Sequence, residues 1–159
     1  MGARGEALAK QFEVKAQEAT AIIESLSDVE WKKTTSAEKW PVGVVVHHVA
    51  EIHGVLGDII KTIADGKPMP ELSMDKIHAM NAQHAKANAG CSKADTLALH
   101  KKNAASVAAM VRGLGDDELD RRAVVIPGLP EMAAGELAGG LLVGHIDEHL
   151  GSIRVTIRR

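Results

Sequence analysis

The chain has 159 residues, about the length of one average domain, with 45% hydrophobic and 25% charged residues. This balance is typical of a folded globular protein and excludes intrinsic disorder. Nineteen Lys and Arg residues face 21 Asp and Glu residues, for a net charge of −2. A protein that binds nucleic acids needs clustered positive charge or aromatic stacking platforms, and aromatic residues make up only 2% of this chain. We therefore expect no nucleic-acid partner.

The sequence predicts neither a secretory signal nor a membrane span. The first ten residues contain no apolar run. The best candidate for a span, residues 123–150, is interrupted by Pro127, Pro130, Glu131 and Glu136. A single cysteine, Cys91, excludes an internal disulfide and a cysteine-rich zinc site. We expect a soluble, cytoplasmic protein that does not bind membranes.

Hydrophobic periodicity in the first half of the chain predicts two long helices. The first covers residues 6–26, and the capping-box spacing of Ser27 and Glu30 then predicts a short helical turn. Residues 32–39 are polar and form a connection. The second long helix begins at Trp40-Pro41, because proline is accepted in a first helical turn, and ends near residue 64.

The second half of the chain predicts two further long helices. Their ranges are 92–115 and 133–157, and a weakly amphipathic helix precedes them over residues 74–89. Residues 66–73 and 115–132 are predicted to lie outside the helices, with a brief extended segment at 123–126. Four long helices without regularly spaced strands predict one all-α domain over residues 1–159, a four-helix bundle.

The eight histidines are the unusual feature of the composition, and two of them form the pattern His145-x-x-x-His149. Side chains at positions i and i+4 lie above each other on one helix face. This face also carries Leu141 and Leu142, whereas Asp147 falls on the outer side. Both imidazoles are therefore predicted to point inward, where a bound divalent metal would offset their burial. The alternative is a pair of core histidines hydrogen-bonded to the backbone or to water.

A third ligand would have to come from another helix. His48 shares its helix face with an apolar stripe that includes Val44 and Ile52. His47 and His53 lie off this stripe, so helical phase selects His48. A histidine within an aliphatic stripe, together with the inward pair, favours a metal site over three core histidines.

The same residues resemble a known family. The segments Trp40-Pro-Val-Gly-Val-Val-Val-His-His48, Leu114-Gly-Asp-Asp-Glu-Leu119 and Gly144-His-Ile-Asp-Glu-His-Leu-Gly-Ser-Ile153, with residues 75–81, are similar to the DinB/YfiT-like superfamily and nearest to its DinB_2 subgroup. The resemblance covers nearly the whole chain. It implies a four-helix bundle whose metal-binding histidines correspond to His48, His145 and His149.

The resemblance also implies a function, a metal-dependent transferase or isomerase that uses a low-molecular-weight thiol. Three imidazoles leave a metal with open positions, as in a catalytic site. Zinc or nickel are the preferred metals, with iron or copper as alternatives. The expected partners are a small thiol and an electrophile, which would enter near Trp40 and the 115–132 connection. A non-enzymatic, stress-associated bundle that holds a metal or small ligand is the alternative function.

Other residues carry weaker signals. Glu148 could support the ligands or act as a base, although a solvated carboxylate is the commoner outcome. The string His145-x-x-Glu148-His149 matches an inverted zinc-protease motif, but the ten residues after His149 supply no acidic ligand. Cys91 precedes a helix, which can lower a thiol pKa, yet it is more simply a passive loop residue.

The remaining histidines and methionines are given structural interpretations. Polar neighbours predict that three histidines are solvated: His78, His84 and His100. Three methionines are expected to fill the core: Met74, Met80 and Met110. The roles of His47 and His53 stay open. Small residues of the last helix, Ala134, Ala138 and Gly139, could admit a second copy, so a homodimer is expected.

Overall fold

The computed structural model describes residues 2–158. Its four long helices are α1 (Ala3–Ser25), α3 (Val42–Ala64), α5 (Lys93–Arg112) and α8 (Leu142–Ile157). The shorter elements are α2 (Asp28–Lys32), α4 (Met74–Ala87), α6 (Asp116–Asp120), β1 (Arg122–Ala123), β2 (Met132–Ala133), α7 (Ala134–Glu136) and the π-helix η1 (Leu137–Leu141). The predicted all-α four-helix bundle is confirmed.

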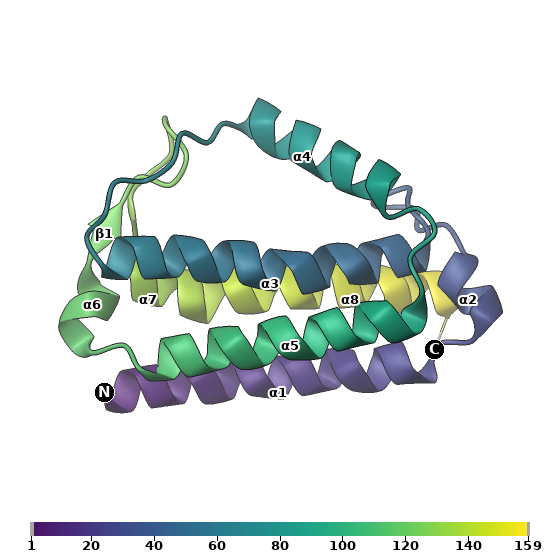
Figure 1. Cartoon of the computed structure of the whole chain (residues 1–159), viewed down its shortest axis with the longest axis horizontal. Helices are drawn as coiled ribbons and strands as arrows, with labels where there is room; N and C mark the ends of the chain where they lie inside the picture. The colour runs from purple at the N-terminus through teal and green to yellow at the C-terminus, as the bar shows by residue number, and fades with distance from the viewer. Residues whose placement is uncertain (1, 159) are drawn as a thin grey trace.

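The long helices form a bundle with two diagonals. α3 packs against α5 and α8, and α1 packs against the same two helices, so α1 lies diagonally opposite α3. Figure 1 shows that α1 and α8 run in one direction while α3 and α5 run in the other. Because α3 and α5 are parallel neighbours, the chain must return along the bundle between them. It does so through α4, which lies on the outer side of α3 (Figure 1).

Apolar side chains from all four helices form one core. The fully buried members include Phe12 of α1, Ile60 of α3, Val111 of α5 and Ile153 of α8. α3 and α5 approach closely at Gly57, where an added Cβ would lie 2.8 Å from Val107 Cγ2. α3 is also long and apolar enough to span a membrane by length and composition, and 67% of its apolar window is buried in the bundle. The candidate for a membrane span is therefore α3. Residues 123–150, the best candidate from the sequence, are not one.

The connection between α5 and α8 is more structured than predicted. α6 occupies residues that the sequence assigned to a loop, because Gly115 N–H bonds to the Glu118 carboxylate 3.0 Å away and caps a short turn. The extended segment predicted at 123–126 is instead the two-residue strand β1, which pairs antiparallel with β2. The short turn predicted after Ser27 is confirmed as α2, with its capping box formed by Ser27 and Glu30.

The small residues of the last helix pack inside the molecule. Ala134 and Ala138 are buried, and an added Cβ at Gly139 would lie 3.0 Å from Leu8 Cδ2 of α1. These residues therefore do not form a free surface for a second copy. The homodimer stays a prediction, without this support.

Candidate metal centre

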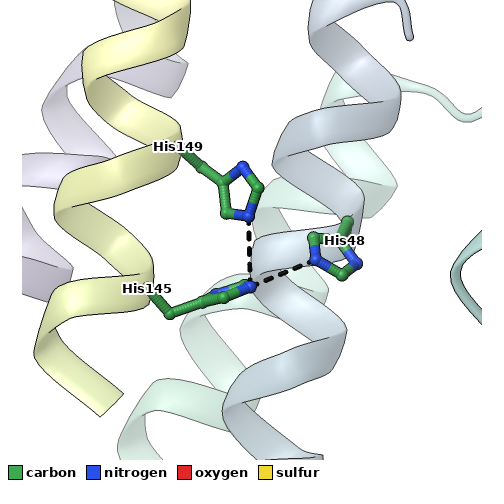
Figure 2. Close-up of side chains that lie close together, drawn as sticks. All are labelled: His48, His145 and His149. Carbon is green, nitrogen blue, oxygen red and sulfur yellow. Dashed lines mark hydrogen bonds between the residues drawn. The ribbon is translucent and has the colours of Figure 1, made fainter. Parts of the chain in front are cut away.

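Three histidines converge between α3 and α8. His48 comes from α3, whereas His145 and His149 come from successive turns of α8 (Figure 2). His145 Nε2 lies 3.1 Å from His48 Nε2 and 3.2 Å from His149 Nε2. The structure thus brings together the three side chains that helical phase selected.

Hydrogen bonds alone do not account for these two short nitrogen–nitrogen distances. An imidazole nitrogen carries either one proton or one lone pair in the ring plane, so His145 Nε2 can make only one such bond. Its second close nitrogen neighbour is left unexplained. Two imidazoles bound to one metal at about 2.05 Å would place their nitrogens about 2.9 Å apart at a right angle and about 3.4 Å apart at a tetrahedral angle. Both observed spacings from His145 Nε2 fall between these values, and the three ligand atoms all lie within 4.8 Å of one another, so the three residues fit a shared divalent ion.

Burial keeps two of these imidazoles, those of His48 and His145, neutral. Desolvation lowers the pKa of His48 to about 4 and the pKa of His145 to about 3, and the neighbouring histidines add to both shifts. At neutral pH both rings therefore offer a lone pair rather than a positive charge. Among the described residues, His145 Nδ1 is buried without a hydrogen-bond partner. The proton of His145 is thus free to occupy Nδ1 and leave Nε2 as a ligand.

Glu38 supports the cluster, and sequence reasoning missed it. Its carboxylate accepts a hydrogen bond from His149 Nδ1 at 2.8 Å and another from Ser152 Oγ at 2.5 Å. Burial raises the pKa of Glu38, but the bonds from Ser152 and His149 outweigh this effect and hold it below its usual value. A carboxylate on Nδ1 directs Nε2 of His149 toward the cluster and increases its basicity.

The chain holds Glu38 in place with a tight turn. Thr35 N–H bonds to the Trp40 carbonyl at 2.9 Å, Lys39 N–H bonds to the Thr35 carbonyl at 3.1 Å, and Lys39 adopts a positive φ of 62°. These bonds fold the polar connection back toward α8. No helical periodicity covers residues 32–39, so the sequence offered no phase argument that could find Glu38.

A cleft of 380 Å³ opens on the three histidines. Trp40 forms one wall, with its ring 5.4 Å from the His48 ring in an edge-on arrangement, and Ile77 and Asn81 of α4 form another. Leu141, expected in the interior, lines this cleft and is 44% exposed. Glu148 also lines the cleft and is exposed.

The predicted route into the site needs correction. Trp40 precedes the N-terminal end of α3, whereas Arg121 in the 115–132 connection bonds to the carbonyl of Ala64 at the opposite end of α3. The two features therefore lie at opposite ends of the bundle and cannot frame one entrance. α4 borders the cleft in place of the 115–132 connection.

Two histidines that were predicted to be solvated are not. His100 is buried and forms a chain of hydrogen bonds, with His53 Nε2 3.1 Å from its Nδ1 and the Ala16 carbonyl 3.0 Å from its Nε2. The three ring nitrogens that form this chain have complementary partners, which marks a structural pair. The His84 side chain is only 8% exposed because it faces α3. His78 is exposed, as predicted.

The predictions for the methionines and for Cys91 have mixed outcomes. Met74 and Met80 are about half exposed, so they do not fill the core, whereas Met110 packs against it. Burial raises the pKa of Cys91, and its Sγ lies 3.4 Å from the Gly43 carbonyl. The helix that follows Cys91 therefore does not activate its thiol.

A four-helix bundle with a three-histidine cluster at the base of a cleft defines the class of this protein. The family model DinB_2, described as the DinB superfamily, matches residues 11–153. The chain belongs to the DinB superfamily. No protein with a curated description matches it.

Two solved structures share the fold. YfiT from Bacillus subtilis, described as a probable metal-dependent hydrolase with an unusual four-helix bundle topology, is 20% identical with a TM-score of 0.78, over 100% of this chain and 89% of YfiT. A mutant of the mycothiol-dependent maleylpyruvate isomerase is 12% identical with a TM-score of 0.76, over 96% of this chain. The match spans 63% of the isomerase.

Proposed function

We propose that this protein is a metal-dependent enzyme that acts on a small thiol and an electrophilic partner, as a transferase or an isomerase. The observation that carries this proposal is that His145 Nε2 lies within 3.2 Å of two other imidazole nitrogens, those of His48 and His149. His48, His145 and His149 would hold one divalent metal, with zinc or nickel preferred and iron or copper as alternatives.

The donor set supports a thiol as the exchangeable ligand. Three neutral imidazoles leave the full charge of a divalent ion uncompensated, and this favours an anion such as thiolate or hydroxide at a free position. The cleft beside the cluster has apolar walls from Trp40, Ile52 and Ile77, and apolar walls would strengthen the interaction by lowering the local dielectric constant. The fold relative described as mycothiol-dependent also uses a thiol, which agrees with this choice.

The test has two stages. First, metal content is measured after dialysis for the wild type and the His145→Ala variant, with His78→Gln as the matched control because His78 is exposed. The His145→Ala variant should lose the metal of this cluster, and the control should keep it. Second, the cobalt form is titrated with a cysteine-type thiol, and a sulfur-to-cobalt charge-transfer band should grow and should be absent in His145→Ala.

The alternative is a non-enzymatic bundle that holds a metal or a small ligand. A protein that retains its cluster metal but shows no spectral change at millimolar thiol would favour this alternative. Thiol-dependent turnover of an electrophile separates the enzyme from a thiol-binding module.

A further inference from the structure

α4 is held to the bundle by few side chains. None of its residues is fully buried, and among the long helices its main packing partner is α3. Its inward anchor is His84, whose side chain is 8% exposed although its helix lies on the outer side of α3 (Figure 1). A helix of 14 residues with so little apolar burial needs another source of attachment.

His84 meets two potential ligands on α3. His47 Nδ1 lies 2.7 Å from His84 Nε2, and a Glu51 carboxylate oxygen lies 3.1 Å from the same nitrogen. His47 and Glu51 are four residues apart, so they project from successive turns of one helix face. All three ligand atoms lie within 4.8 Å of one another.

The contacts of His84 exceed what its ring can satisfy. Nε2 offers one proton or one lone pair, so it can bond to His47 or to Glu51 but not fully to both. Among the described residues, His84 Nδ1 is also buried without a hydrogen-bond partner. An unpartnered buried nitrogen and a doubly contacted one on the same ring indicate that hydrogen bonds do not explain this arrangement.

We infer that His47, Glu51 and His84 form a second divalent-metal site that fastens α4 to α3. The ligand set of two histidines and one glutamate is one that zinc accepts, with water completing the coordination. The site repeats the plan of the first, in which two residues four apart on one helix meet a histidine from another. It is distinct in its ligands, although the His48 and His84 rings lie 5.6 Å apart.

The position of this site connects it to the cleft over the first cluster. α4 contributes Ile77 and Asn81 to the cleft over the first cluster, and a second cleft of 520 Å³ between α3 and α4 is lined by Glu51 and His84. A metal that ties His84 to α3 would therefore hold the wall of the substrate cleft in place. Loss of this metal would loosen α4 and leave the four-helix core intact.

The test is a zinc titration of the metal-free protein followed by equilibrium dialysis and metal analysis. The wild type and the control His78→Gln, also on α4, should bind two zinc ions per chain. The variants His84→Gln and His145→Ala should each bind one, and the double variant should bind none. Glu51→Gln, a change on the exposed side of the site, should weaken the second ion about tenfold or more without affecting the first.

Amide hydrogen exchange supplies an independent readout. Zinc should slow exchange across α4 in the wild type and in His145→Ala, but not in His84→Gln. One zinc ion in the wild type and none in His145→Ala would overturn the second site while leaving the first. One ion in the wild type and none in His84→Gln would instead support the second site and contradict the first.

Discussion

Glu38 allows a quantitative test of how the first cluster is built. Its carboxylate accepts bonds from both His149 and Ser152, and its side chain is 10% exposed. Loss of a carboxylate behind a metal-bound histidine typically reduces metal affinity by about 10- to 100-fold, equivalent to about 1.4–2.7 kcal/mol.

The two obvious substitutions should differ in size. In Glu38→Gln the amide oxygen can still accept from His149, and the amide N–H₂ can donate to the Ser152 hydroxyl. Only the negative charge is lost, so we expect about a tenfold weaker zinc complex. Glu38→Ala removes both acceptors and frees the His149 ring to turn, so we expect a loss near 100-fold.

The assay is a zinc competition titration against a chromophoric chelator, in the His84→Gln background so that only the first cluster reports. Glu148→Gln is the matched control, because Glu148 lines the same cleft and is exposed. Unchanged affinity in Glu38→Ala, or an equal loss in Glu148→Gln, would refute the role assigned to Glu38.

Three further predictions concern the fold and the assembly. Burial lowers the pKa of His53 to about 3 and also lowers that of His100, whereas both titrate near 6.5 when unfolded. Protons therefore bind the unfolded chain first, and the free energy of unfolding should fall as the pH drops from about 6.5 toward 3. In urea melts, His53→Gln should reduce this slope by about 1.4 kcal/mol per pH unit, and an unchanged slope would contradict the assignment. Gly57→Ala should cost about 1–2 kcal/mol through overlap with Val107, whereas Gly151→Ala, where the added Cβ would meet no atom within 4 Å beyond the backbone of its own helix, should be neutral or stabilising. Light scattering at micromolar concentration should show a homodimer, and a single species of 16.8 kDa would retire that prediction.

Helical phase predicted the parts of the site that lie on long helices. The spacing of His145 and His149 fixes their common face, and the aliphatic stripe around His48 fixes the face that meets α8. These inferences need only the periodicity of one helix at a time. The fold class followed from the same periodicity, since four amphipathic segments must bury their apolar faces together.

The parts that failed depend on contacts between elements. Glu38 lies in a turn whose shape is set by bonds between Thr35 and Trp40, and no local period reveals where such a turn points. His84 and His100 have polar neighbours in sequence, but their own side chains face α3 and α1. Neighbours along a helix report the average exposure of a segment, and they cannot show that one polar side chain turns toward a histidine on another helix.

The π-helix η1 has a consequence for comparing this chain with its relatives. A π-turn holds one residue more than an α-turn. The residues of α8 are therefore offset by one position, or about 100° of helical phase, from where an uninterrupted α-helix that continues α7 would place them. Because the wide turn absorbs the extra residue, deletion of one residue from Leu137–Leu141 would convert η1 to an α-helix and leave His145 and His149 on the side where they now lie relative to Ala134. In an alignment, a relative with an uninterrupted last helix should therefore carry a one-residue gap here, ahead of histidines that still superimpose.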